Sequence, residues 1–133
     1  MIFWIDDDIN TLGPFVDEFN DAGIKLKLFS NVDIFYNTIK KEGVIVDVFI
    51  IDLMLPYGDL FDEVQTAQGE VTGSCLISLI RDIPQYEDTP IILLTGINNE
   101  EASNKAASLG AHVIHKKKIW PDELVDLVRQ YVN

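Results

Sequence analysis

Short apolar segments alternate along the chain with segments whose apolar residues recur at helical spacing. The apolar segments are rich in β-branched and aromatic residues, which favours strands. They lie at 2–5, 24–29, 44–51, 91–94 and 111–115. After each of them, apolar residues recur at steps of three or four, which is typical of helices with one buried face. The pattern therefore predicts five strands, each followed by a helix.

This order of elements, (βα)5, predicts a three-layer, doubly wound α/β fold in which helices cover both faces of a five-stranded parallel sheet. The segment 24–29 alternates apolar residues with Lys25 and Lys27, as expected of an edge strand. The segments 44–51 and 91–94 are continuously apolar, as expected of strands covered on both faces. In such folds ligands bind at the carboxyl ends of the strands.

Polar residues gather at those predicted strand ends. They are Asp6, Asp7 and Asp8 after the first strand, Asp52 after the third, Thr95 after the fourth, and Lys116, Lys117 and Lys118 after the fifth. Crowded carboxylates repel one another unless a cation is present, and oxygen ligands without His or Cys favour Mg²⁺ or Mn²⁺. A carboxylate beside such an ion can attack a phosphoryl group, and a lysine and a hydroxyl can bind the phosphoryl oxygens. The residues thus predict a site that forms an aspartyl phosphate.

Composition narrows the classes of partner. Among 133 residues, 22 Asp and Glu stand against 10 Lys and Arg, for a formal charge of −12. This charge disfavours direct binding of nucleic acid or of an anionic membrane surface. One cysteine, Cys75, excludes an internal disulfide and fits a reducing compartment, so we expect a cytoplasmic protein with a single domain over 1–133.

The motifs resemble those of one known family. Ile5-Asp6-Asp7, Asp52-Leu53-Met54-Leu55-Pro56, Thr95-Gly96, and Gly110-Ala111 followed by Lys117 resemble the receiver domain of two-component response regulators. The resemblance covers essentially the whole chain and implies a flavodoxin-like fold with strand order 2-1-3-4-5. It also implies that a histidine kinase or phosphotransfer protein phosphorylates Asp52, which changes binding to a downstream protein. The chain would then be no enzyme beyond its own phosphorylation and dephosphorylation.

The resemblance also implies a role for each site residue. Asp7 and Asp52 would bind Mg²⁺ directly with the Met54 carbonyl, and Asp6 would act on the ion through water. Thr95 and Lys117 would contact the phosphoryl oxygens. Lys117 is chosen because it lies six residues after Ala111 and seven before Leu124, as the family lysine does, and because strand alternation would turn Lys116 to the other face.

Two departures from the family keep a second interpretation open. Lys118 replaces the proline that usually follows the lysine, and Ile114 stands where a switch Tyr or Phe is common. A pseudo-receiver, which binds a partner without being phosphorylated, is therefore the alternative. A homodimer through the fourth helix, fifth strand and fifth helix is left open, as is whether the chain is a piece of a larger regulator.

A segment of about a dozen extra residues lies within 57–72, between the third strand and its helix. It carries Asp59, Asp62, Glu63 and Glu70 and no basic residue. Either it is a flexible solvated loop, or it is a recognition element or partial lid over the site. Phe61 and Val64, three residues apart, suggest a short helix within it.

An enzyme of the haloacid-dehalogenase-like phosphatase class is the third interpretation. Asp6 and Asp8 form its Asp-x-Asp pattern, but Asn10 stands where that family has a threonine. The phosphatase interpretation also leaves Asp52 unexplained, so the sequence favours a receiver.

Overall fold

The computed structural model describes residues 1–132 and contains one parallel sheet between two layers of helices. The strands are β1 (Ile2–Ile5), β2 (Leu26–Phe29), β3 (Val48–Asp52), β4 (Ile91–Thr95) and β5 (Ala111–His115). The helices are α1 (Gly13–Asp21), α2 (Val32–Ile39), α3 (Thr72–Asp82), α4 (Glu100–Ser108) and α5 (Pro121–Arg129). Three short 3-10 helices are η1 (Ile9–Leu12), η2 (Pro84–Tyr86) and η3 (Lys116–Lys118). The sheet order β2-β1-β3-β4-β5 confirms the predicted fold class and strand order.

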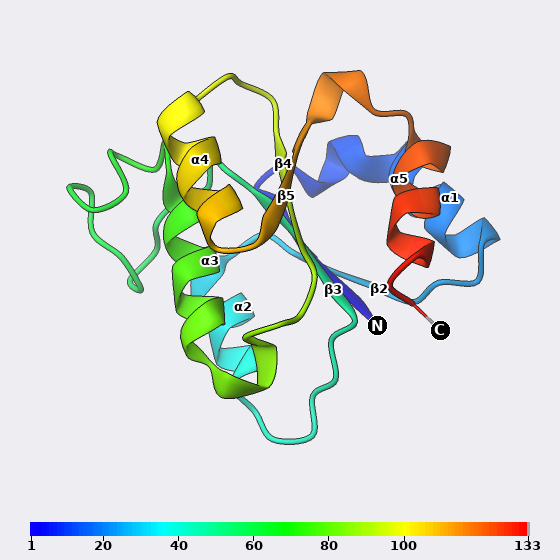
Figure 1. Ribbon diagram of the computed structural model, residues 1–133, viewed down its shortest axis with the longest axis horizontal. Helices are drawn as coiled ribbons and strands as arrows, with labels where there is room; N and C mark the ends of the chain where they lie inside the picture. Colours follow the sequence, from blue (N-terminus) through cyan, green and yellow to red (C-terminus); the bar gives the residue numbers. More distant parts are fainter. Residues whose placement is uncertain (133) are drawn as a thin grey trace.

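The two faces of the sheet bury two separate cores. Helices α1 and α5 cover one face, and α2, α3 and α4 cover the other (Figure 1). Along β1, Phe3 and Ile5 point to the α2–α3–α4 side, whereas Ile2 and Trp4 point to the α1–α5 side. Trp4 is fully buried, and its ring packs edge-on against Phe15 at 5.5 Å between ring centroids. Because β1 is buried on both faces, it fixes the position of Asp6, the residue that follows its end.

Two strands are shorter than their apolar segments predicted. The segment 24–29 enters the sheet only at Leu26, because the Ile24 N–H donates to the Phe19 carbonyl at the end of α1. The segment 44–51 enters the sheet at Val48, because the Val44 carbonyl accepts a hydrogen bond from the Gln85 side chain. Each segment thus begins with a hydrogen-bond partner from outside the sheet.

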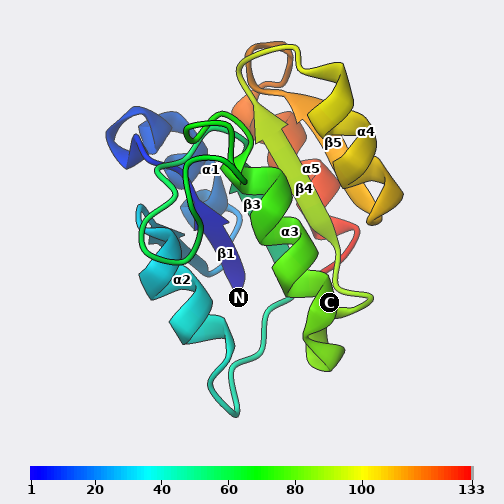
Figure 2. The same ribbon diagram turned by 90° about the vertical axis from the view of Figure 1, so that its left-hand side faces the viewer.

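Residues 57–71 form neither helix nor strand, but they are anchored to the fold. The segment projects near the carboxyl edge of the sheet, above α2 and α3 (Figure 2). Asp33 of α2 accepts backbone N–H bonds from Asp59 at 2.9 Å and Leu60 at 2.7 Å. Phe61 is buried in the α2–α3–α4 core, whereas Val64 is 86% exposed. The prediction of a short helix with Phe61 and Val64 on one face is therefore wrong.

The helices of residues 1–132 are too short or too polar to cross a membrane.

Candidate functional site

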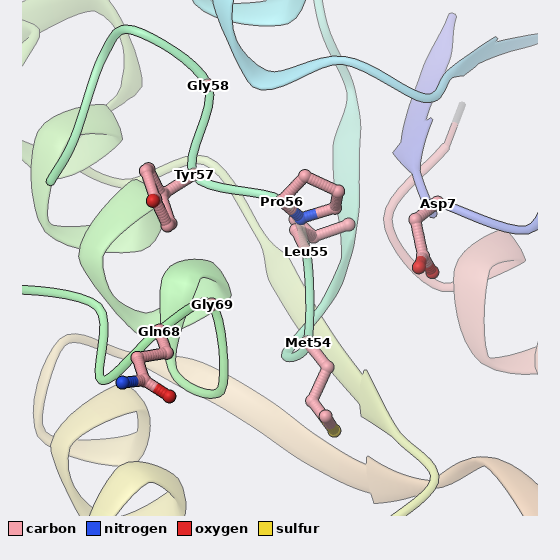
Figure 3. Close-up of a pocket in the computed structure, with 8 residues that line it drawn as sticks. All are labelled: Asp7, Met54, Leu55, Pro56, Tyr57, Gly58, Gln68 and Gly69. Atoms are coloured by element: carbon pink, nitrogen blue, oxygen red, sulfur yellow. The ribbon is translucent and has the colours of Figure 1, made fainter. Parts of the chain in front are cut away.

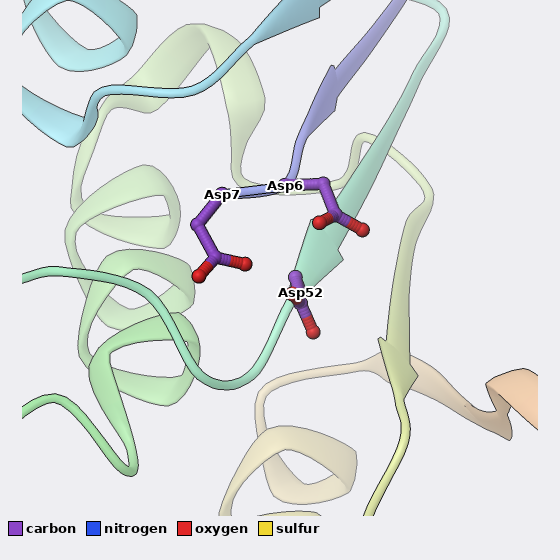
Figure 4. Close-up of side chains that lie close together, drawn as sticks. All are labelled: Asp6, Asp7 and Asp52. Atoms are coloured by element: carbon purple, nitrogen blue, oxygen red, sulfur yellow. The ribbon is translucent and has the colours of Figure 1, made fainter. Parts of the chain in front are cut away.

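Three carboxylates meet at the carboxyl ends of β1 and β3. These strands are neighbours, and Ile5 pairs with Ile51, so Asp6 and Asp52 end their strands side by side. Carboxylate oxygens of Asp6, Asp7 and Asp52 lie within 4.8 Å of one another and face a common space (Figure 4). Asp6 is 1% exposed and Asp52 is 8% exposed, whereas Asp7 is open to solvent. The site is thus a buried acidic pair with one solvent-facing carboxylate at its mouth.

The environment of Asp52 favours its neutral form when no cation is bound. Burial is the largest cause, the Asp6 carboxylate the next, and together they raise the pKa of Asp52 to about 7. The Lys116 ammonium acts in the opposite direction and limits the rise of this pKa. A cavity of about 300 Å³ beside Asp52 is lined by Asp7, Asp52, Met54, Gly96, Ile97 and Lys116. These carboxylate oxygens fit a hard divalent cation such as Mg²⁺ or Mn²⁺, which would relieve their repulsion.

The structure places Lys116 beside the carboxylates, and it places the predicted Lys117 outside their cavity. The Lys116 ammonium lies 2.5 Å from Oδ2 of Asp6, while Oδ1 of Asp6 accepts the Asp8 N–H at 2.9 Å. Lys117 is exposed and lines a separate surface cavity with Trp120, which is itself 72% exposed.

Strand register explains the difference. Asp52 pairs with Leu94 and Leu94 pairs with Ile114, so these three residues share a row with Asp6 and point to one face of the sheet. Lys116 lies two residues beyond Ile114 and shares that direction. Alternation thus turns Lys116 toward the carboxylates, not away from them.

Thr95 lies at the end of β4 beside the cavity, but its hydroxyl is hydrogen-bonded to the backbone of Ile97. The hydroxyl donates to the Ile97 carbonyl at 3.0 Å and accepts the Ile97 N–H at 3.2 Å. Ile114, at the position of the expected aromatic switch, packs partly buried against the α1–α5 core. No cis peptide bond occurs in residues 1–132, so the Lys117–Lys118 bond is trans.

The start of α3 holds the chain that follows Asp52. The Gly73 N–H donates to the Leu53 carbonyl at 2.8 Å, and the Thr72 hydroxyl donates to the Leu55 carbonyl at 2.6 Å. Met54, whose carbonyl is the predicted metal ligand, lies between these two anchored residues. Sequence reasoning missed Thr72 and Asp33 as anchors, because both contacts depend on how the 57–71 segment folds back.

Chemically, the arrangement offers a nucleophilic carboxylate, two further carboxylates for a cation, and an ammonium group within reach of developing negative charge. This combination suits phosphoryl transfer, in which positioning and charge neutralisation supply most of the catalysis.

Comparison with known proteins gives a family match and a consistent fold. A family model described as "Response regulator receiver domain" matches residues 2–129. A CheY-like receiver domain protein from Methanospirillum hungatei superposes with a TM-score of 0.75 at 18% identity, covering 97% of this chain and 90% of that one. Chemotaxis response regulator CheY4 of Vibrio cholerae gives a TM-score of 0.74 at 21% identity, covering 98% and 97%. Among curated proteins, none matches the chain in sequence.

Proposed function

This chain belongs to the family of response regulator receiver domains, signalling modules of two-component systems, and we propose that it is phosphorylated on Asp52. The phosphoryl group would come from a histidine kinase or phosphotransfer protein, and its presence would change binding to a downstream protein. The observation that carries the proposal is the convergence of the Asp6, Asp7 and Asp52 oxygens within 4.8 Å of one another. The buried free Cys75 fits a cytoplasmic protein.

In the proposed reaction an Asp52 carboxylate oxygen attacks the phosphorus atom of the donor. Asp52 must be ionised to attack, and its pKa of about 7 means that part of the metal-free population is protonated at neutral pH. Asp7 and Asp52, with the Met54 carbonyl, would hold Mg²⁺, and Asp6 would act through water. An ion held by these residues would supply neutralisation of the charge on the transferring oxygens.

Lys116 and Thr95 would stabilise the product. Lys116 is positioned by its bond to Asp6 and can turn from that carboxylate to a phosphoryl oxygen on Asp52. The Thr95 hydroxyl would first have to leave the Ile97 carbonyl. This exchange of partners offers a route by which phosphorylation alters the loop after β4.

Magnesium is expected to stabilise the folded protein. At a concentration one hundred times its dissociation constant, a ligand that binds only the folded state raises the free energy of unfolding by about 2.7 kcal/mol. Asp7→Asn should abolish this gain, and Asp8→Asn should retain it because Asp8 is outside the carboxylate cluster. The measurement is thermal unfolding with and without Mg²⁺. An unchanged melting temperature in the wild type would contradict a metal site.

The two neighbouring lysines provide a second test. Lys116→Ala should slow labelling by acetyl phosphate about tenfold, since a hydrogen bond to a charged group contributes about 1.5 kcal/mol or more. Lys117→Ala should label within about twofold of wild type, because Lys117 lies outside the cavity. Intact mass measured over time gives both rates. A larger loss in Lys117→Ala would reinstate the sequence-based assignment.

The overall test is uptake of one phosphoryl group from acetyl phosphate in the presence of Mg²⁺. Failure of a well-folded protein to take it up would favour the pseudo-receiver. We propose two kinds of partner for the phosphorylated form. One is a downstream protein, and the other is a second copy of this chain bound through α4, β5 and α5.

A further inference from the structure

A groove separate from the acidic cavity runs from the mouth of the site to the 57–71 segment. Its volume is about 460 Å³. Eight residues line it: Asp7, Met54, Leu55, Pro56, Tyr57, Gly58, Gln68 and Gly69 (Figure 3). Asp7 and Met54 also line the cavity at Asp52, so the groove adjoins that cavity.

The groove is built before any ligand arrives. Gly58 adopts a φ of +61°, and a Cβ there would lie 2.5 Å from the Asp33 carboxylate that anchors the segment. On the opposite side, the Leu55 N–H donates to the Gly69 carbonyl at 3.3 Å, and the buried Thr72 hydroxyl holds the Leu55 carbonyl. Both walls are thus fixed by α2 and α3.

The chemistry of the groove indicates the kind of partner that fits it. Met54, Pro56 and Tyr57 provide an apolar surface, and Met54 is exposed. Asp7 is the charged residue that lines the groove, and the segment 57–72 along one side of it carries four acidic residues and no basic one. An apolar side chain of a partner would pack on the apolar surface, and neighbouring Lys or Arg residues would be attracted by the acidic groups.

We propose that this groove binds the segment of the phosphodonor protein that flanks its phosphohistidine, through an apolar side chain with basic neighbours. The inference rests on the proposed function. Asp7 and Met54 line both the groove and the cavity at Asp52, so a donor held at Asp52 has the groove next to it. The anchors of the groove lie in α2 and α3, away from Thr95 and β5. A surface that reads phosphorylation must change with it, so this fixed groove suits the donor, which binds before the transfer.

The transfer itself balances simply. The P–N bond of the phosphohistidine breaks as the P–O bond to Asp52 forms, and the released imidazole nitrogen takes a proton from water. The groove contributes binding and orientation of the donor, not chemistry.

The test uses two synthetic peptides, each with one phosphohistidine next to a leucine. Lysines surround this pair in one peptide, and glutamates replace them in the other. Wild type should take the phosphoryl group about tenfold faster from the lysine peptide. Gln68→Lys, which puts a positive charge in the groove, should lose about tenfold of that rate. Gln65→Lys carries the same charge on the α4 side of the segment and should stay within about twofold.

Two further measurements separate this inference from the proposed function. Acetyl phosphate has no flanking residues, so it should label wild type and Gln65→Lys at equal rates and should not show the tenfold loss in Gln68→Lys. The unphosphorylated lysine peptide should shift the backbone amide signals of Gly58, Gln68 and Gly69 in Asp52→Asn. If acetyl phosphate labels nothing, the proposed function fails, and these shifts still decide whether the groove binds. Equal transfer from both peptides, equal losses in Gln65→Lys and Gln68→Lys, or amide shifts elsewhere would overturn the inference.

Discussion

Asp52→Asn should abolish phosphate incorporation from acetyl phosphate while the protein stays folded. The substitution keeps the shape of the side chain, but an amide cannot serve as the nucleophile that forms an acyl phosphate. Intact mass after treatment with Mg²⁺ present measures the loss, and circular dichroism checks the fold. Asp8→Asn is the matched control, because Asp8 is exposed and lies outside the carboxylate cluster.

The other outcomes of this experiment discriminate among the three interpretations. Equal labelling of wild type and Asp52→Asn would refute phosphorylation at Asp52. Loss of labelling in Asp8→Asn, with Asp52→Asn unaffected, would indicate the phosphatase-like site instead.

The same substitution should change how stability depends on pH in metal-free buffer. Between pH 3.8 and about 7, folded Asp52 holds a proton that the unfolded chain has released. The folded state therefore binds more protons in this window, and the free energy of unfolding falls as pH rises, by about 4 kcal/mol in all. Asp52→Asn should remove this fall in urea titrations at several pH values. A wild-type profile that is flat over this window would contradict the raised pKa.

Gly73→Ala should destabilise the protein by about 3 kcal/mol, at the upper end of overpacking substitutions. A Cβ on Gly73 would lie 2.2 Å from the Asp52 carbonyl oxygen and 2.8 Å from the Leu53 Cα. Both neighbours are backbone atoms of the central strand and its continuation, so α3 must move off β3. We expect the midpoint of urea unfolding to fall and labelling by acetyl phosphate to slow.

Gly96→Ala is the matched control for this effect. Gly96 also lies beside the site, but a Cβ there meets no atom within 4 Å. Its unfolding midpoint should match that of wild type. If the two alanine variants were equally stable, the close packing of α3 against the end of β3 would be disproved.

The fold was predictable because its signals are local. Strands and helices in an α/β fold differ in hydrophobic period, and the edge strand shows it in Lys25 and Lys27. The acidic cluster was predictable for a related reason, since parallel strands bring their carboxyl ends to one edge. The strand starts at Leu26 and Val48 were not, because they depend on hydrogen bonds from outside the sheet.

The lysine and the anchored segment required three-dimensional information. Choosing between Lys116 and Lys117 depends on a row of paired residues across three strands, which no count along the chain contains. The anchor of the 57–71 segment joins Asp33 to backbone groups more than twenty residues away. An acidic composition is equally compatible with a solvated loop and with this folded arrangement.

The two tryptophans differ in exposure, since Trp4 is buried and Trp120 is exposed. Their fluorescence therefore reports on two different parts of the protein. Trp4 is sealed between the sheet and α1, so its emission is shielded from an aqueous quencher until the sheet itself opens. Trp120 is exposed to solvent between η3, which contains Lys116, and α5. Iodide therefore samples Trp120 in the native state and reaches Trp4 only on unfolding. If iodide quenching of Trp120 changes while Trp4 remains shielded, the chain beside the site has rearranged without unfolding. No added label is needed for this measurement.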